Sequence, residues 1–348
     1  MFEYTGSVHI HSVFSDGSGE VPEIVRFAQE LGLDFIMLTD HNTLRAKDEG
    51  FEGFHGTTAL ITGYEINDKE NRNHYLAFGV EKTISTRFPA KDYVRMIKEA
   101  GGIGFLAHPH EKRDSNKEYP PYPWTEWDTE DFTGMEIWNH MSEWMENLTE
   151  ENKYFSFVHP LKSIKMPPRE TLETWDRLSQ KRRVVGIGGV DAHAHKVNLL
   201  GLMEVEVFPY KVLFKSIRTH ILLHENYDFS INEQFTGFRV ALLDALKNGR
   251  TFFANHYLGD AKGFRFAMVS GGTIYYMGDE FRLEKEAEIK VSVPGTAKNF
   301  IRVLRNGELF ASSEEGDLNA VITRPGAYRA EVLRGNRGWI FSNHIRVL

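Results

Sequence analysis

Short apolar runs alternate with helical segments from the start of the chain to about residue 255, and this order is the strongest constraint on the fold. Strand-like runs are expected at 8–11, 35–39, 59–63, 75–80, 103–107, 134–138, 184–190 and 202–207. Apolar residues recur at helical spacing in 21–31, 90–100, 141–155, 169–181 and 239–247. A repeated β-then-α order predicts a parallel sheet, most economically closed into a (β/α) barrel.

The pattern changes after about residue 257. Runs that alternate apolar with polar residues follow one another at 264–269, 273–276, 287–293, 300–305, 309–311, 320–322, 327–333 and 339–347. Asn306-Gly307 lies between two of these runs and is a strong hairpin signal. Closely spaced strands of this kind predict a small β-sandwich. We therefore expect a barrel over residues 1–257 and a β-sandwich domain over 258–348.

Composition limits the chemistry and the partners. The 348 residues include 15 histidines and no cysteine, and their formal charge is −8. The missing cysteines exclude disulfides, thiolate zinc sites, iron–sulfur clusters and cysteine nucleophiles. The acidic balance and the lack of an evident basic stripe disfavour polymeric nucleic acid as a partner. Neither a signal peptide nor a span of about 18 apolar residues is seen, so we expect a cytoplasmic protein without a membrane partner.

Histidines and carboxylates stand where the expected strands end or begin. They are His9, His11 and Asp16 at the first strand, Asp40 and His41 after the second, Glu65 and His74 around the connection from the third to the fourth, His108 after the fifth, and Asp191 and His193 after the seventh. Each residue alone could be a surface histidine, a turn or a helix cap. The carboxyl ends of strands in a parallel barrel share one rim, where such barrels build active sites. The whole set therefore indicates one site.

Imidazole and carboxylate without thiolate form a ligand set for zinc, manganese or iron. There are more ligands than one tetrahedral ion needs, so at least two ions are expected. A carboxylate that bridges two ions holds them about 3.5–4 Å apart, a spacing suited to activating a water. The residues thus point to a metal-dependent hydrolase.

The ordered motifs resemble the PHP (polymerase and histidinol phosphatase) superfamily over about residues 6–255. The motifs are His9-x-His11 with Asp16-Gly17, the segment Thr-Asp-His-Asn-Thr at 39–43, Gly63-x-Glu65, Ala107-His108-Pro109 and Asp191-Ala192-His193. The resemblance implies a distorted (β/α)7 TIM-like barrel with a trinuclear metal centre. It assigns one ion to His9, His11, Glu65 and Asp191, a second to Glu65, His74 and His108, and a third to Asp16, His41 and His193.

The layout of the whole chain narrows this resemblance. A PHP barrel followed by a β domain that ends in Trp339-Ile340-Phe341-Ser342-Asn343 is similar to the CehA/McbA branch, which includes a carbaryl hydrolase. Better-known PHP members are phosphoesterases, so we expect hydrolysis of a small phosphorylated molecule by a metal-bridged hydroxide. The alternatives are a carboxyl-ester, carbamate or amide hydrolase, a nuclease acting on short oligonucleotides, and a binding module with an inert metal site.

Several further residues have weaker indications. Asp40 is expected either to orient His41 or to cap the following segment. His195, two residues after His193, is a candidate general acid. Weaker substrate contacts are predicted at His110, Arg113 and Asn139. Residues 119–127 are too rich in proline and aromatic residues for a helix or strand, which leaves a packed loop or a lid as alternatives.

Overall fold

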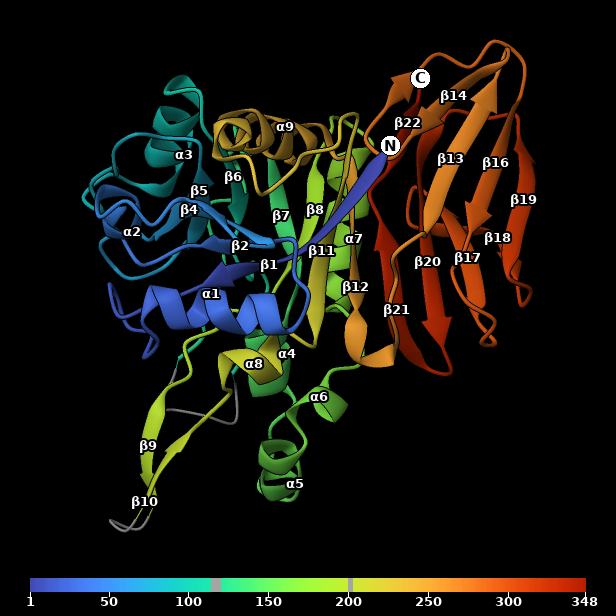
Figure 1. The fold of residues 1–348 in the computed structure, drawn as a ribbon. Coiled ribbons are helices and arrows are strands. Elements are labelled where there is room, and N and C mark those ends of the chain that lie inside the picture. Colours follow the sequence, from blue (N-terminus) through green and yellow to red (C-terminus); the bar gives the residue numbers. More distant parts are fainter. Residues whose placement is uncertain (114–119, 200–202) are drawn as a thin grey trace.

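The structure, a computed structural model, describes residues 1–113, 120–199 and 203–348. It is mixed α/β up to residue 258 and rich in β-strands beyond it, as predicted (Figure 1). The strands of the first part are β1 (Phe2–Ile10), β2 (Phe35–Leu38), β3 (Gly53–His55), β4 (Thr58–Ile66), β5 (Tyr75–Phe78), β6 (Ile103–Leu106), β7 (Gly134–Asn139), β8 (Val185–Gly189), β9 (Lys196–Leu199), β10 (Met203–Glu206), β11 (Ile217–Leu223) and β12 (Thr251–Asn255). Its helices are α1 (Val21–Glu30), α2 (Arg45–Asp48), α3 (Ala90–Glu99), α4 (His140–Glu146), α5 (Lys153–Val158), α6 (Pro160–Ser163), α7 (Arg169–Ser179), α8 (Tyr210–Leu213) and α9 (Phe235–Asn248), with 3-10 turns η1 (Asn232–Gln234) and η2 (His256–Leu258). The later strands are β13 (Arg265–Ser270), β14 (Thr273–Tyr276), β15 (Glu280–Phe281), β16 (Ala287–Ser292), β17 (Phe300–Arg305), β18 (Glu308–Ser313), β19 (Asp317–Ile322), β20 (Gly326–Arg334), β21 (Arg337–Ser342) and β22 (Ile345–Val347).

The sheet of the first part curls back on itself. Its strand order is β11-β1-β2-β4-β5-β6-β7-β8. Beyond β8 the chain returns to β1, because Val190 N donates to Val8 O at 3.0 Å and Ile10 forms a parallel bridge with Ala192. The carboxyl ends of β1 and β8 are therefore neighbours, although these strands lie far apart in the sheet order.

The expectation of an all-parallel sheet is wrong at β5. This strand pairs antiparallel with both β4 and β6, and Ile66 at the end of β4 faces Tyr75 at the start of β5. The physical reason is the short connection of residues 67–74, because a parallel crossover needs a dozen residues or more. As a result, the start of β5 lies beside the end of β4.

The predicted strand at 202–207 does not join this sheet. Within the described residues, β10 pairs only with β9, antiparallel to it, and the two strands project together from the body of the protein (Figure 1); Leu202 lies outside the described residues. The position beside β1 is taken by β11, which runs antiparallel to it with Thr5 opposite His220. Most of β11 is buried, so its residues show no polar–apolar alternation to mark them as a strand.

The predicted helices form, with one break. Val21, Ile24, Val25 and Ala28 give α1 the buried stripe that its spacing predicts. The left-handed Gly249, with φ 75°, ends α9 as a C-terminal glycine should. The predicted helix at 141–155 is divided into α4 and α5, because Asn152 Oδ1 accepts a hydrogen bond from Thr149 N at 2.8 Å and the chain turns there.

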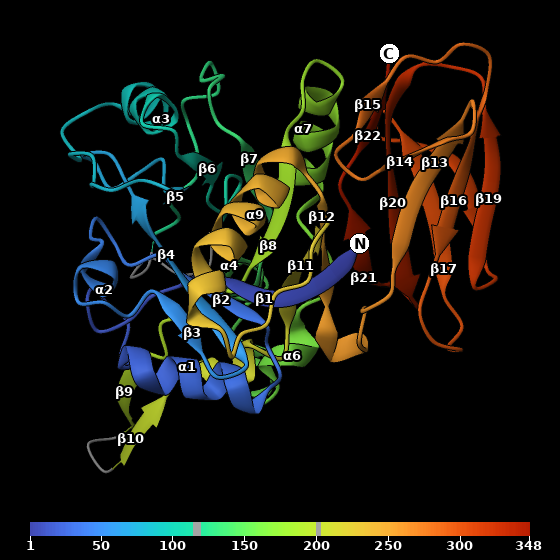
Figure 2. The ribbon, with the colours of Figure 1, turned by 45° about the horizontal axis from the view of Figure 1, so that its top comes forward.

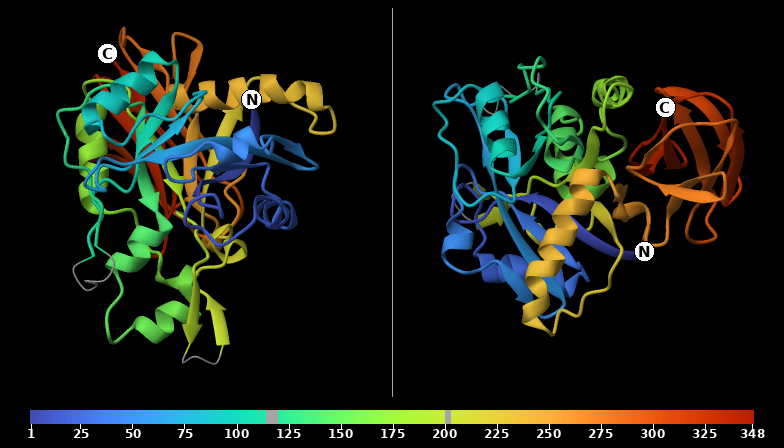
Figure 3. Two further views of the ribbon diagram at one scale, coloured as in Figure 1. Left: turned by 90° about the vertical axis from the view of Figure 1, so that its left-hand side faces the viewer. Right: turned by 90° about the horizontal axis from the view of Figure 1, so that it is seen from above.

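The C-terminal region continues the main sheet rather than standing apart. β21 lies beside β12 (Figure 2) and pairs antiparallel with it, with Phe341 opposite Phe253. Among the described residues, one sheet of 16 strands therefore crosses the expected boundary near residue 257. The Asn343 side chain accepts from Gly186 N at 2.7 Å and donates to Gly186 O and Thr251 O at 2.8 Å. The remaining β-strands lie to one side of the α/β part, as a view from above shows (Figure 3). The position of a domain boundary stays a prediction.

A buried ion pair also joins the two parts. Arg329 on β20 donates to Asp176 on α7 through Nε at 2.6 Å and Nη2 at 2.8 Å, and His344 Nε2 lies 2.8 Å from the same carboxylate. Burial alone would raise the pKa of Asp176, but Arg329 and His344 hold it well below its ordinary value.

Among the described residues, no helix has the length and apolar character needed to cross a bilayer.

Candidate metal centre

A bulge at His9 directs the first pair of histidines. The β1–β2 register shifts between Val8 and Ile10, and His9 has a φ of 66°. Both His9 and His11 reach the same oxygen, since their Nε2 atoms lie 3.1 and 3.2 Å from Glu65 Oε2. The expectation that these two imidazoles face one point is therefore met.

Left-handed backbone recurs where candidate ligands stand. His9, His108 and Asp191 have φ values of 66°, 29° and 54°. Non-glycine residues rarely adopt this region, and each instance costs of the order of 1–3 kcal/mol that the surrounding structure must offset. Such strain is concentrated at functional sites. The strained backbone at these three residues therefore supports the interpretation that they belong to one.

Glu65 lies at the centre of the cluster and is 1% exposed. Its Oε2 is 3.1 Å from His9, 3.2 Å from His11 and 3.5 Å from His41, and its Oε1 is 2.8 Å from His74 and 3.4 Å from His108. Burial alone would raise the pKa of Glu65, but the charge of His9, followed by His74 and His41, holds it well below its ordinary value. His74 can reach Glu65 because β5 is antiparallel and begins beside the end of β4.

Two aspartates extend the cluster. Asp191 Oδ1 lies 3.3 Å from His9 Nε2, 3.5 Å from His11 Nε2 and 3.5 Å from His193 Nδ1. Asp16 Oδ1 lies 3.3 Å from His193 Nε2 and 3.6 Å from His11 Nδ1, and its Oδ2 lies 3.7 Å from His41 Nε2. The structure thus brings together all the predicted ligands. They form four groups whose ligand atoms lie within 4.8 Å of one another: His11, Asp16, His41 and His193; His9, Glu65 and His108; His9, His11 and Asp191; and His41, Glu65 and His74.

The buried polar atoms of this cluster fit divalent cations. Both ring nitrogens of His11, Nε2 of His74 and Nδ1 of His108 are buried without a hydrogen-bond partner. Leaving such atoms unpaired is costly, and a bound ion would satisfy those that face the carboxylates. Burial alone would lower the pKa of His11, but Asp191 and Glu65 raise it to about 9. The carboxylates therefore attract positive charge, and the donor set suits zinc, manganese or iron.

Asp40 holds the loop that carries Asp16. Its Oδ1 accepts from Ser12 N at 2.7 Å and from Ser15 Oγ at 2.9 Å, and its Oδ2 accepts from Ser12 Oγ at 2.8 Å. These hydrogen bonds tie the end of β1 to the end of β2. Orientation of His41 by Asp40 stays a prediction.

His195 and Asn139 lie beside the candidate ligands. The His195 ring stacks on His193 with 4.9 Å between ring centroids, and partial desolvation of the ring followed by the charge of His193 lowers its pKa. Asn139 Nδ2 lies 3.4 Å from Asp191 Oδ2 and 3.5 Å from His9 Nδ1, while its Oδ1 caps α4 by accepting from Ser142 N at 2.9 Å. Their predicted roles in catalysis and substrate binding remain open.

The other two predicted substrate contacts have protein partners of their own. His110 Nδ1 lies 3.1 Å from Thr171 Oγ1, and its ring stacks on Trp127 at 4.8 Å. Arg113 Nε donates to Glu111 Oε1 at 2.9 Å. These contacts attach the loop after β6 to its surroundings, and binding of a phosphate by either residue stays a prediction.

Sequence reasoning missed Glu136 on β7. Its Oε1 lies 2.9 Å from His9 Nδ1, and its Oε2 accepts from Asn139 Nδ2 and His108 N, both at 2.9 Å. A bulge between Glu136 and Trp138 turns Glu136 and Asn139 to the same side, although they are three residues apart. The available signal was an acid inside an otherwise apolar run, because a buried carboxylate needs partners.

Gly189 leaves the space that Glu136 occupies, and this gives a test. A Cβ at Gly189 would lie 2.0 Å from Glu136 Oε1. Gly189→Ala must displace the carboxylate that orients His9, so we expect metal affinity to fall about 10- to 100-fold. Gly53→Ala is the matched control, because a Cβ there meets nothing within 4 Å. Metal titration of both variants checks the prediction, and equal affinities would contradict it.

The proline- and aromatic-rich segment is packed where the structure describes it; Tyr119 lies outside the described residues. Trp124 is 2% exposed, and its backbone N donates to Pro109 O at 2.9 Å. Thr125 N donates to Asn73 Oδ1 at 2.6 Å. The ring of Tyr122 stacks on His74 with 4.9 Å between centroids. Residues 120–127 are therefore a packed loop beside the centre.

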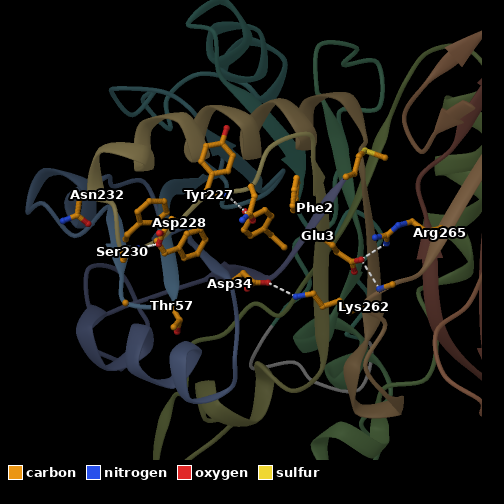
Figure 4. A pocket seen from close by; sticks show the side chains of 17 residues that line it. Phe2, Glu3, Asp34, Thr57, Tyr227, Asp228, Ser230, Asn232, Lys262 and Arg265 are labelled. Atoms are coloured by element: carbon orange, nitrogen blue, oxygen red, sulfur yellow. Dashed lines mark hydrogen bonds and ion pairs between the residues drawn. The ribbon is translucent and has the colours of Figure 1, made fainter.

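A groove of about 1260 Å³ lies elsewhere (Figure 4). It is lined near the start of β1 by Phe2 and Glu3, and by Asp34, Tyr227 and Arg265. Two of these lining residues are paired, since Glu3 Oε2 accepts from Arg265 Nη1 at 2.6 Å. The candidate ligands stand at the other end of β1, so this groove is separate from the metal centre.

Three solved structures are distantly similar to this chain. A two-domain protein from Bacteroides vulgatus that contains a predicted PHP-like metal-dependent phosphoesterase is 16% identical with a TM-score of 0.45, over 99% of this chain and 95% of that chain. A candidate metal-dependent phosphoesterase from Bifidobacterium adolescentis is 17% identical with a TM-score of 0.38, over 54% and 87%. An amidohydrolase from Chromobacterium violaceum, with bound sulfate and no metal, is 15% identical with a TM-score of 0.32, over 54% and 87%.

Those structural likenesses are too distant to indicate an activity, and no curated protein matches the chain. The PHP domain profile matches residues 7–182, just over half of the chain. This range contains seven of the nine predicted ligands, from His9 to His108. The chain therefore belongs to the PHP domain family.

Proposed function

We propose that the protein is a metal-dependent phosphoesterase that hydrolyses a small phosphorylated substrate. The observation that carries this proposal is Glu65, a buried carboxylate with ring nitrogens of five histidines 2.8–3.5 Å from its two oxygens. Divalent ions bound around Glu65 would offset the negative charge on the oxygens of a phosphate ester. Membership of the PHP family supports the same function.

Two or three divalent ions would be held by the predicted sets. These sets are His9, His11, Glu65 and Asp191; Glu65, His74 and His108; and Asp16, His41 and His193. When bound, the ions would supply Lewis-acid chemistry and lower the pKa of a water toward about 7. Glu65 belongs to two of the sets and would bridge them.

The protein's own groups would orient the ligands and move protons. Glu136 accepts at His9 Nδ1, so it determines which nitrogen of His9 faces the centre. His195 lies beside His193, and its lowered pKa favours the neutral ring, which can first accept a proton and then deliver it to a leaving group. Asn139 Nδ2 lies near both His9 and Asp191, so it would hold the two side chains at a fixed position relative to each other.

We also propose the finer architecture that the resemblance implies. The return of the chain after β8 to β1 supports a distorted (β/α)7 barrel. The sheet β14-β13-β16-β19 and the strands around β20 share one apolar core, which supports a β-sandwich. The attachment of this region through β21 and Asn343 supports a layout of the CehA/McbA type.

A substrate panel separates the candidate functions. Purified protein supplied with manganese, iron or zinc would be assayed on p-nitrophenyl phosphate, on p-nitrophenyl and naphthyl carboxyl esters and carbamates, and on a short oligonucleotide. Cleavage of the phosphate ester supports the proposal. Cleavage of carboxyl esters alone supports the CehA/McbA alternative, cleavage of the oligonucleotide alone a nuclease, and bound metal without turnover an inert binding module.

Removal of metal is expected to abolish hydrolysis, and re-addition is expected to restore it. The pKa of His11 and that of His108 are each raised to about 9, so protons occupy these imidazoles in the metal-free protein at neutral pH. Ligands must lose those protons, and metal affinity should therefore rise as the pH rises toward about 9. Calorimetry in two buffers of different ionisation enthalpy would measure the released protons. Equal affinity at about pH 6 and about pH 8 would contradict this expectation.

A further inference from the structure

Glu111 is a buried acid beside the metal centre. It follows His108 in a tight turn, where its N donates to His108 O at 3.0 Å, and its side chain is 0% exposed. Its Oε1 accepts from Ser142 Oγ at 2.7 Å and from Arg113 Nε at 2.9 Å, and its Oε2 accepts from Tyr122 N at 2.9 Å. One carboxylate thus connects the end of β6, the start of α4 and the packed loop at 120–127.

The first link runs to His108. Glu111 Oε2 lies 3.9 Å from His108 Nδ1, a buried nitrogen without a hydrogen-bond partner. The other nitrogen of the same ring, Nε2, lies 3.4 Å from Glu65 Oε1. Histidines that bind metal usually direct their second nitrogen to a carboxylate, which determines the tautomer and the ring orientation. Glu111 lies on that side of the His108 ring, and because 3.9 Å is longer than a hydrogen bond, a shift of about 1 Å would let it orient His108 in this way.

The second link runs to His74. Glu111 holds the backbone of Tyr122, whose ring lies almost parallel to that of His74, with 4.9 Å between centroids and 17° between planes. The Arg113 guanidinium lies over the Tyr122 ring at 5.6 Å and is itself bound to Glu111. His74 Nδ1 lies 2.8 Å from Glu65 Oε1, so a shift of Tyr122 would change how His74 meets that oxygen.

We propose that Glu111 is the positioning residue for one particular ion, the one assigned to Glu65, His74 and His108. It lies beside both imidazoles of that set, with Oε2 3.9 Å from His108 Nδ1 and with Tyr122 between it and His74. In the first ion set, His9 is held by Glu136 and Asn139, and Glu136 Oε2 also accepts from the backbone N of His108, whereas within the described residues Glu111 hydrogen-bonds with no residue of the first set. This inference rests on the proposed function, and it predicts that loss of Glu111 weakens one ion selectively.

Titration of metal-free protein with Mn²⁺, followed by elemental analysis after dialysis, tests the inference. Glu111→Gln should weaken one binding event by about 10- to 100-fold and leave the others unchanged. Raised Mn²⁺ should then restore kcat with little change in KM. The matched control is Glu143→Gln, since Glu143 is also a buried carboxylate on this side and accepts from Trp138 Nε1 at 2.6 Å and Lys165 N at 2.6 Å. The control should bind every ion as the wild type does.

The outcomes are distinguishable. If Glu111→Gln binds all ions with wild-type affinity, or weakens all of them equally, the inference is overturned. If the wild type binds no divalent ion, the proposed function fails instead. Tyr122→Leu removes the stack on His74 but retains Glu111, and it should weaken the same event by a smaller factor. This second variant keeps the inference open to test if Glu111→Gln does not fold, and unchanged binding by Tyr122→Leu would then overturn it.

Discussion

Replacing Glu65 with glutamine is expected to abolish hydrolysis and to release at least one metal ion. The amide keeps the size of the side chain but removes the negative charge that five imidazoles share at 2.8–3.5 Å. It also places an N–H₂ donor where a cation would bind. We expect kcat/KM to fall about 1000-fold or more, which corresponds to about 4 kcal/mol of transition-state stabilisation.

The measurement is kcat/KM with manganese, iron or zinc supplied, together with metal content and a circular dichroism spectrum. Glu52→Gln is the matched control. Glu52 Oε1 accepts from the backbone N and from Oγ1 of Thr62, both at 2.9 Å. Thr62 lies on β4, as Glu65 does, but Glu52 is not one of the candidate ligands. The control should retain metal and activity. Wild-type turnover and metal content in Glu65→Gln would remove the basis of the site assignment.

Replacing Asp176 with alanine is expected to lower the free energy of unfolding by about 3–5 kcal/mol. The change leaves Arg329, which is 1% exposed, with Glu331 as its remaining hydrogen-bonded carboxylate, and removes the acid that faces His344. A buried guanidinium that loses one of its two carboxylate partners is left with unpaired N–H donors, which is costly because water cannot replace the lost carboxylate. The effect should appear as a lower urea midpoint.

Urea unfolding at several pH values would test this, with Glu173→Ala as the control. Glu173 lies on the same helix and pairs with Arg169, but its side chain is 60% exposed, so its loss should change stability by less than about 0.5 kcal/mol. The pKa of Asp176 is lowered in the folded protein. Its contribution is therefore full above about pH 4 and is lost as the pH falls toward the folded value. Equal destabilisation by both variants would contradict the role of the buried pair.

Most of the candidate site could be predicted because the carboxyl ends of parallel strands meet at one rim. The position of His74 could not be predicted in this way. His9, His108 and Asp191 could be grouped because the carboxyl ends of β1, β6 and β8 meet. His74 precedes its strand, so an all-parallel sheet would have placed it at the opposite end. It belongs to the cluster because the short connection 67–74 forces β5 to run antiparallel. His74 is in the set of residues at strand ends or beginnings, but only the family resemblance assigns it to an ion.

Other features depend on pairing between distant segments. Residues 202–207 alternate apolar and polar side chains as a sheet strand would, yet β10 pairs with β9, because local alternation does not specify a partner. The bulge that brings Glu136 and Asn139 together leaves no mark in the sequence of β7. The pairing of β12 with β21 joins segments about ninety residues apart, and the change of pattern near residue 257 gives no sign of it.

Because β12 pairs with β21, the α/β part and the C-terminal strands would stay together even without an intact backbone between β12 and β13. A single proteolytic cut in residues 259–263 would leave a long fragment and a short one. They would still share the β12–β21 ladder, the contacts of Asn343 with β8 and the buried Asp176–Arg329 pair. The nicked protein should therefore behave as a pair of complementing fragments that separate only on denaturation.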